Sequence, residues 1–238
     1  MLPGEAALRS IARRLRARMP SVFAGLDVAI PRRRPPWGGP MNGQHGRQEI
    51  VRALVNLRKP VAIVETGTYL GVTTEYLALL TGVEVRTCES QSIYYRSALK
   101  RFRDNPLVRA ELADSVDFLK ALAADRSVPK RGVLFYLDAH WDANLPLRDE
   151  MEIIGQSWQE PWILIDDFRV PADPGYGFDD YGEDAALQLS YLAPAPWWTP
   201  LFPALPSAQE TGARRGCVVL VPPNQADSLV ATGLLRRP

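Results

Sequence analysis

The sequence predicts an α/β fold built on one mostly parallel sheet of seven strands. Between residues 61 and 192, short apolar runs alternate five times with segments of helical periodicity. After residue 192 two further apolar runs follow each other with no helical segment between them, which predicts one antiparallel strand near the C-terminal edge. Because crossover connections place helices against a parallel sheet, we expect helices on both of its faces.

Each predicted element depends on a local pattern. Continuous apolar runs are typical of strands buried on both faces, and they predict strands over residues 61–65, 83–88, 108–112, 133–138, 162–166, 197–202 and 216–221. Apolar residues at helical spacing predict helices over residues 46–57, 72–81, 92–103, 115–124, 147–157 and 183–192. A chain of 238 residues, 46% of them hydrophobic, is long enough to bury one such core.

Composition excludes several classes of protein. With 23% charged residues and two cysteines, the chain fits neither a disordered protein nor a disulfide scaffold. No apolar run reaches the roughly 18–20 residues of a membrane-spanning helix, and the start of the chain lacks an apolar signal-peptide core. Cys88 and Cys217 lie in apolar runs, so we expect free thiols and a cytoplasmic protein.

Charge divides the chain into a basic arm and an acidic body. Residues 1–59 carry 12 Lys and Arg against 3 Asp and Glu, and the remainder carries 16 against 24. We predict an arm over residues 1–41, with an arginine-rich helix at 5–18, and one domain over residues 42–238. The helix either packs on the body or contacts a membrane surface or polyanion. The acidic body favours a cation site over a nucleic-acid groove.

A glycine loop and a series of acids follow the predicted parallel strands, where open α/β sheets bind ligands. The loop Glu65-Thr66-Gly67-Thr68-Tyr69-Leu70-Gly71 allows a tight turn and close approach of the backbone to a ligand, ahead of a helix N-terminus. Glu89 can accept both hydroxyls of a ribose. Asp114, followed by Ser115, can either cap a helix or accept a hydrogen bond from an adenine amino group.

Paired acids follow the fourth and fifth strands, in Asp138-Ala139-His140-Trp141-Asp142 and Asp166-Asp167. Like charges so close together need a counter-charge. A bound divalent cation supplies one, so the sequence indicates a cation site at this edge.

The motifs resemble a known family. The loop over residues 65–71 is similar to the first motif of class I S-adenosylmethionine-dependent methyltransferases, in the E-x-G-x-Y-x-G form of the metal-dependent catechol and caffeoyl-CoA types. Leu137-Asp138-Ala139-His140-Trp141 and Ile165-Asp166-Asp167-Phe168 resemble the bacterial branch that methylates macrolide sugars. The resemblance covers about residues 42–222. It implies a Rossmann-like methyltransferase fold, S-adenosylmethionine as cofactor, and Mg²⁺ or another hard divalent cation.

The resemblance also implies roles for individual residues. Asp138, Asp166 and Asp167 match the metal ligands, and the segment over residues 42–47 lies where these enzymes place a cap over the cofactor. The residues expected to bind the cofactor are Gln44, Glu65, Gly67, Thr68, Tyr69, Gly71, Thr73, Glu89, Ser90, Asp114, Ser115 and Asp138.

The implied reaction is methyl transfer to a hydroxyl of a small molecule. A sugar of a glycosylated natural product or polysaccharide is the favoured acceptor, and a phenol is the alternative. The catechol type has a lysine shortly after its first metal aspartate, which this sequence lacks. Asp138 and His140 are therefore the candidate proton acceptors, with packing or support of a neighbouring group as the alternative role of His140.

Late loops are expected to build the acceptor pocket. Aromatic residues are available at Trp141, Trp158, Tyr176, Phe178 and Tyr181, although core packing is the alternative for Trp158. The Pro/Gly-rich segment over residues 171–180 is expected to gate the substrate, with its acids Asp173, Asp179 and Asp180 in solvent. A homo-oligomer is possible through Trp197-Trp198.

Two competing interpretations remain open at this level. An NAD(P)-dependent oxidoreductase shares the alternating fold, but the third glycine of its fingerprint and a Tyr-x-x-x-Lys pair are missing. A non-catalytic binding protein is the other alternative, although unpaired acids are costly to keep clustered. Binding of S-adenosylmethionine would distinguish a methyltransferase from an oxidoreductase. Metal-dependent product formation would distinguish an enzyme from a binding protein.

Overall fold

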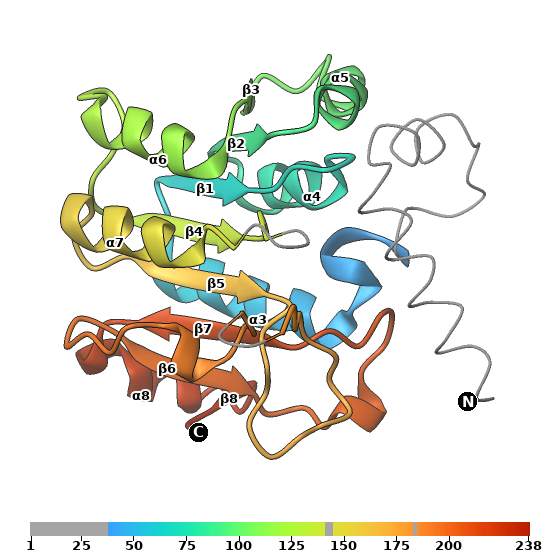
Figure 1. Cartoon of the computed structure of the whole chain (residues 1–238), viewed down its shortest axis with the longest axis vertical. Helices are drawn as coiled ribbons and strands as arrows, with labels where there is room; N and C mark the ends of the chain where they lie inside the picture. The colour runs from blue at the N-terminus through green and yellow to red at the C-terminus, as the bar shows by residue number, and fades with distance from the viewer. Residues whose placement is uncertain (1–37, 141–144, 183–184) are drawn as a thin grey trace.

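The computed structural model describes residues 38–140, 145–182 and 185–238, so the predicted arm helix and Trp141 lie outside the described residues. Within these ranges eight strands form one sheet in the order β3-β2-β1-β4-β5-β7-β6-β8 (Figure 1). The strands are β1 (Ala62–Thr66), β2 (Glu84–Glu89), β3 (Val108–Leu112), β4 (Val133–Leu137), β5 (Trp162–Asp166), β6 (Thr199–Pro203), β7 (Cys217–Val221) and β8 (Leu235–Arg236). The first five are parallel, as predicted.

The antiparallel part of the sheet is larger than predicted. Strand β7 runs antiparallel to both β5 and β6, and β8 adds an eighth strand antiparallel to β6. Only two residues long, β8 is too short to produce a recognisable alternation in the sequence.

The helices agree with the predicted segments, except that one predicted helix does not form and one short helix, over residues 226–230, is not predicted by the sequence pattern. They are α3 (His45–Arg58), α4 (Val72–Thr81), α5 (Ser92–Arg101), α6 (Ser115–Ala124), α7 (Leu147–Ser157) and α8 (Ala226–Val230), with short 3₁₀ turns including η2 (Pro40–Gly43). The helix predicted over residues 183–192 is wrong. There the described backbone bonds to other loops, with the Leu187 amide donating to the Asp179 carbonyl at 2.9 Å, and only Leu189–Tyr191 form a 3₁₀ turn.

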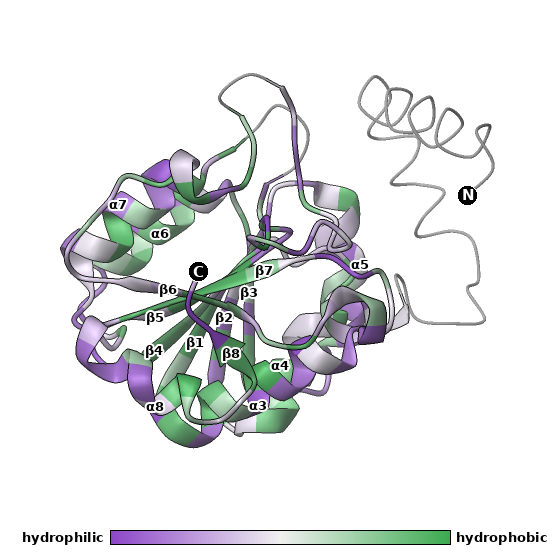
Figure 2. Cartoon of the chain, turned by 90° about the horizontal axis from the view of Figure 1, so that it is seen from below, coloured by the Kyte–Doolittle hydropathy of each residue, from purple (hydrophilic) through white to green (hydrophobic). Residues whose placement is uncertain are grey.

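Helices cover both faces of the sheet, as predicted (Figure 2). One core holds Phe118 of α6 and Ile154 of α7 against Phe135 of β4, and the other holds Leu54 of α3 and Leu77 of α4. Neighbouring strand residues alternate between these cores, so β1, β4, β5 and β7 are buried along their whole length. Burial on both faces explains why these strands are continuous apolar runs in the sequence.

The topology gathers the candidate residues at one edge of the sheet. All five parallel strands end there, and the loops after β1, β4 and β5 lie beside η2 and the start of α3 (Figure 1). Because β7 runs the opposite way, its first residue, Cys217, pairs with Asp166, the last residue of β5. The segment before β7 therefore also reaches this edge.

Two further expectations concern cysteines and membranes. Cys88 and Cys217 are buried free thiols, as predicted. Among the described residues, no helix combines the length and apolarity that crossing a membrane demands.

Candidate active site

The loop after β1 needs its glycines for close packing. Gly67 has a φ of 87°, and a Cβ at this position would lie 2.1 Å from the carbonyl oxygen of Asp138. Gly71 has a φ of 74°, and a Cβ there would lie 2.4 Å from the ring of Phe102. The positive φ values and the lack of space for a Cβ both require glycine at these two positions. The glycine loop thus lies directly on the backbone at the end of β4.

A buried polar network supports this loop from below. The carboxylate of Glu65 accepts hydrogen bonds from the hydroxyls of Thr74 and Thr87, the latter at 2.7 Å. The Thr87 hydroxyl in turn lies 2.6 Å from that of Thr68. Burial raises the pKa of Glu65 to about 7, with the two threonine hydrogen bonds and the Glu89 charge as smaller influences. Glu65 therefore shapes the loop from within the core, rather than facing its opening.

The end of β2 contributes a carboxylate held by backbone amides. Glu89 accepts hydrogen bonds from the amides of Tyr69 and Gln91, both at 2.8 Å. Its burial raises its pKa, and the amide hydrogen bonds oppose this shift. The Tyr69 ring lies 4.6 Å from that of Tyr94, centroid to centroid. The structure thus brings Tyr69 and Glu89 together at the edge of the sheet where the parallel strands end, which we call the rim. Ser90 is exposed beside them.

The residues after β3 fit the capping alternative. Asp114 is exposed and is the N-cap of α6, where its carboxylate accepts a hydrogen bond from the Val116 amide at 2.9 Å. Ser115 is buried next to it. An exposed carboxylate at this rim remains able to accept a further hydrogen bond.

The turn η2 and the predicted cap segment connect α4 to the residues just before β7. The Thr73 hydroxyl accepts a hydrogen bond from the Met41 amide at 3.0 Å, which ties η2 to the first turn of α4. The side chain of Gln44 exchanges two hydrogen bonds with the backbone of Arg215, at 2.8 and 2.6 Å. Both polar atoms of the Gln44 side chain are therefore used to hold the cap segment against the backbone of Arg215.

Asp166, at the end of β5, is buried and already fully engaged. Its carboxylate accepts from the Tyr136 hydroxyl at 2.6 Å and from the Asp167 amide at 2.6 Å, and it pairs with the buried guanidinium of Arg47. Arg47 also donates to the carbonyls of Arg215 and Gly216. Although burial opposes it, the Arg47 charge holds the pKa of Asp166 below its ordinary value.

The next residue, Asp167, meets a second arginine. Its carboxylate accepts from Arg215 Nε at 2.7 Å, and the same guanidinium pairs with Asp179. Asp167 has a φ of 53°, an uncommon conformation for a residue with a side chain. Burial, followed by the Asp166 charge, raises the pKa of Asp167 to about 7. The expectation that Asp179 is solvated is wrong, because its carboxylate turns inward to Arg215.

Asp138 and His140 lie across from Asp167. The Asp138 side chain is 35% exposed, whereas the ring of His140 is completely buried. His140 Nε2 is 3.8 Å from Asp138 Oδ1, and burial lowers the pKa of His140, which favours a neutral imidazole. One ligand atom each from Asp138, His140 and Asp167 lie within 4.8 Å of one another. The structure thus places His140, rather than Asp166, with the two other predicted acids.

The charges of this cluster leave room for a divalent cation. Within the part of the chain that the structure describes, four carboxylates, those of Asp138, Asp166, Asp167 and Asp179, meet two guanidinium groups. Were all four ionised, two negative charges would remain. Oxygen donors with a residual charge of this sign fit a divalent ion. The residues present therefore fit the ion that the sequence implied.

Sequence reasoning missed Arg215 and gave Arg47 no role of its own. The antiparallel register offered one signal, since a residue just before β7 must lie near the end of β5. Nothing in the local pattern marks Arg47, whose partner Asp166 is 119 residues away in the chain.

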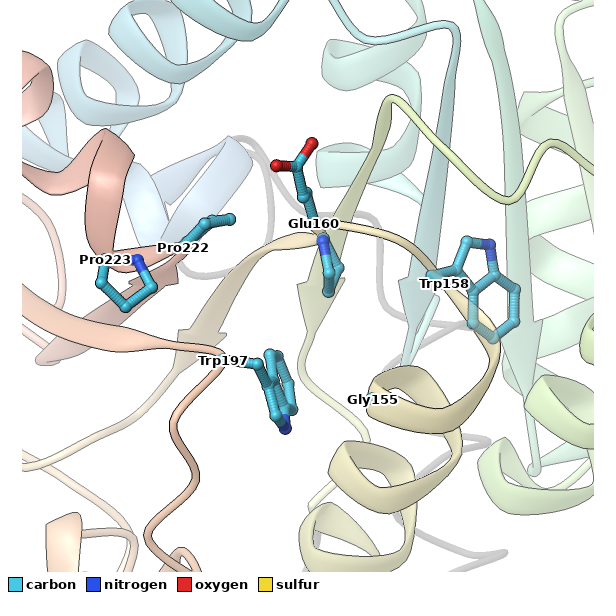
Figure 3. Close-up of a pocket in the computed structure, with 7 residues that line it drawn as sticks. Gly155, Trp158, Glu160, Trp197, Pro222 and Pro223 are labelled. Carbon is cyan, nitrogen blue, oxygen red and sulfur yellow. The ribbon is translucent and has the colours of Figure 1, made fainter.

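A separate hollow lies at the opposite edge of the sheet (Figure 3). It is lined by residues at the end of α7 and at the strand ends remote from the glycine loop, namely Gly155, Trp158, Glu160, Pro161, Trp197, Pro222 and Pro223. Trp158 is only 4% exposed and packs edge-on against Phe135. The core-packing alternative for Trp158 is confirmed, and this residue plays no part in the candidate site.

Solved structures share this fold. An O-methyltransferase from Bacillus cereus, in complex with SAH, has a TM-score of 0.55 and 16% identity, covering 87% of this chain and 89% of that chain. The O-methyltransferase TomG from Streptomyces achromogenes, involved in tomaymycin synthesis and solved with SAM, has a TM-score of 0.52 and 18% identity, covering 74% and 79%. No protein-family model and no curated protein sequence matches the chain. The likeness establishes the α/β fold that these O-methyltransferases have.

Proposed function

We propose that the protein transfers a methyl group from S-adenosylmethionine to a hydroxyl of a small molecule, with a divalent cation bound beside it. One observation carries the proposal: the glycine loop after β1 lies against the end of β4, where Asp138 begins the acidic cluster. A nucleoside site and a cation site thus adjoin on one rim. The fold shared with O-methyltransferases solved with SAM or SAH supports the same conclusion.

The cofactor half of the rim has donors and acceptors suited to a nucleoside. We assign Glu89 to the ribose hydroxyls, since it is the carboxylate at the end of β2. Gly67 and Gly71 let the loop pack closely on Asp138 and Phe102, which fixes the loop backbone at this edge of the sheet. Asp114 and Ser115 are assigned to the adenine edge. Glu65, Thr68 and Thr73 act through the loop and cap that they hold in place.

The chemistry needs a deprotonated acceptor next to an activated methyl group. When bound, S-adenosylmethionine supplies that methyl group, and a divalent cation lowers the pKa of a coordinated hydroxyl. In the transfer a carbon–oxygen bond forms, the carbon–sulfur bond breaks, and the hydroxyl proton leaves. Asp138 is the accessible carboxylate at the junction of the two halves, so we assign it as the proton acceptor. Residues of the rim that orient the acceptor contribute the rest.

We propose a sugar hydroxyl as the acceptor, with a phenol as the alternative. The motifs around Asp138 and Asp166 resemble those of enzymes that methylate macrolide sugars. Phe178 and Tyr181 lie in the segment that closes on Asp167, where the Asp179 amide donates to the Asp167 carbonyl at 2.9 Å. Aromatic faces at that position suit either a sugar or a phenol.

Calorimetry with S-adenosylmethionine and with NADH tests this function. We expect one molecule of S-adenosylmethionine per chain and no binding of NADH. Glu89→Gln removes the charge that accepts ribose hydroxyls and should weaken binding about tenfold, because hydrogen bonds to charged groups contribute roughly 1.5–3 kcal/mol. Glu84→Gln is the matched control, since Glu84 begins the same strand at the opposite edge of the sheet and pairs with Arg86 and Arg109.

Product formation then separates an enzyme from a binding protein. Labelled methyl should pass to a glycosylated acceptor, stop on dialysis against EDTA, and resume when a divalent ion is added. Binding of NADH in place of S-adenosylmethionine would support an oxidoreductase instead. Full transfer without any divalent ion would remove the cation from the proposal.

A further inference from the structure

His140 is a buried imidazole that lies near the backbone of Asp166. Its side chain is fully buried, and no hydrogen bond of normal geometry from within the described residues reaches either ring nitrogen. Leaving a buried polar group without a hydrogen bond destabilises the folded protein. Its Nε2 is 3.8 Å from Asp138 Oδ1, too far for a hydrogen bond. The ring is thus placed beside carboxylates without being bonded to them.

The spacing of this group fits ligands of one ion. Two ligands on opposite sides of an ion with bonds of about 2.1 Å are about 4.2 Å apart. The ligand atoms of Asp138, His140 and Asp167 lie within 4.8 Å of one another, so small side-chain movements would bring them to that range.

Asp166 is a poorer ligand in this arrangement. Both of its carboxylate oxygens already accept hydrogen bonds, one from Tyr136 and the other from Arg47 and the Asp167 amide. To reach an ion, it would have to leave Arg47, whose guanidinium also holds the carbonyl of Gly216 at 3.0 Å. A buried cation left without its carboxylate is strongly destabilising. Asp166 therefore acts as a positioning residue that fixes Arg47 and the start of the Asp167 loop.

We infer that Asp138, His140 and Asp167 bind the divalent ion, and that their mixed oxygen and nitrogen set favours a first-row transition ion over Mg²⁺. Imidazole suits transition metals, whereas Mg²⁺ prefers an all-oxygen shell. The inference rests on the proposed function for the use of the ion, but the binding itself can be measured without cofactor or acceptor. A neutral imidazole has one basic nitrogen, so a histidine that ligates the ion cannot also take the acceptor proton, whereas Asp138 can ligate through one carboxylate oxygen and accept the proton on the other.

Manganese provides a direct test on the untagged full-length chain. The chain contains two histidines, His45 and His140, so a nitrogen signal from imidazole has only two possible sources. We expect one Mn²⁺ per chain by electron paramagnetic resonance, with ¹⁴N coupling in the electron spin-echo. His140→Asn should abolish this coupling and weaken Mn²⁺ binding at least tenfold, since even supporting groups of metal sites contribute 10–100-fold. His45→Asn, at an exposed position of α3, should leave both unchanged.

Two further readouts complete the test. Mg²⁺ should displace Mn²⁺ only at concentrations at least tenfold above those of Mn²⁺. Calorimetry with S-adenosylmethionine on the same samples tests the proposed function separately. Mn²⁺ bound without nitrogen coupling, unaltered coupling in a folded His140→Asn protein, equal affinity for Mg²⁺, or no Mn²⁺ binding at millimolar concentration would each overturn the assignment. If S-adenosylmethionine still binds in such a case, the proposed function survives and only the ligand set fails.

Discussion

The two halves of the rim, at the ends of β1 and β2 and at the ends of β4 and β5, differ in the groups that balance their acids. At the ends of β1 and β2, Glu65 and Glu89 are balanced by neutral donors, the hydroxyls of threonines and the amides of the chain. Near the ends of β4 and β5, by contrast, the described residues bring four acids against two arginines, namely Asp138, Asp166, Asp167 and Asp179 against Arg47 and Arg215. Acids held by neutral donors build the shape of a site. Acids that outnumber their cations create a demand for another positive charge.

Removing Arg47 should have the largest effect on stability of the substitutions that distinguish the two halves. Arg47→Met leaves Asp166 buried without its counter-charge, and breaking a buried ion pair typically costs 3–5 kcal/mol. Urea unfolding should show a loss of this size. Arg52→Ala, in the same helix α3 but partly exposed and paired with Glu49, should cost less than about 1 kcal/mol. Equal losses in the two variants would mean that the Arg47 pair is not what holds this half together.

The next largest effect concerns the glycine loop. Gly67→Ala must place a Cβ at a positive φ and against the Asp138 carbonyl, so we expect a loss of about 3–4 kcal/mol and a sharp loss of affinity for S-adenosylmethionine. Gly82→Ala also has a positive φ, but no atom lies within 4 Å of the new Cβ. This control should lose only about 1–2 kcal/mol in thermal or urea unfolding. Similar losses would show that backbone strain alone, and not contact with β4, requires glycine in the loop.

A smaller effect should appear as a pH dependence. Unfolded, Glu65 loses its proton near the ordinary pKa of 4.5, whereas in the folded protein its pKa is about 7. Between these values only the unfolded state is ionised, so this group makes stability fall as pH rises from about 4.5 to 7. Glu65→Gln keeps an oxygen for Thr74 and Thr87 and removes this dependence. Relative to the unaltered protein, the variant should gain up to about 3 kcal/mol between pH 5 and pH 8, measured by urea unfolding. A difference that is the same at both pH values would contradict the burial of an ionisable Glu65.

The two halves also differ in how far the sequence predicted them. The glycine loop and the acids after the parallel strands are set by local pattern, because strand, turn and helix follow each other within a few residues. The arginines that pair with Asp166 and Asp167 come from α3 and from the segment before β7, so their positions depend on long-range packing. The same limit explains the error at Asp179, since a Pro/Gly-rich segment gives no local sign that Arg215 turns one of its acids inward.

The incorrect prediction of a helix over residues 183–192 has a related cause. The apolar residues there have helical spacing, yet the backbone of Leu187 bonds to the backbones of Arg169 and Asp179, and its side chain is buried in the core. Tertiary hydrogen bonds therefore override the local periodicity. The acids near the ends of β4 and β5 are hard to interpret for the same reason, because the residues that surround them come from distant parts of the chain.

The most direct measurement is a crystal of the full chain soaked with S-adenosylhomocysteine and Mn²⁺, with diffraction recorded at the manganese edge. We predict a nucleoside with its ribose on Glu89 and one anomalous peak bonded to Asp138, His140 and Asp167. A nucleoside lying elsewhere, an anomalous map without a peak at these residues, or a peak bonded to Asp166 in place of His140 would contradict this division into a nucleoside half and a cation half.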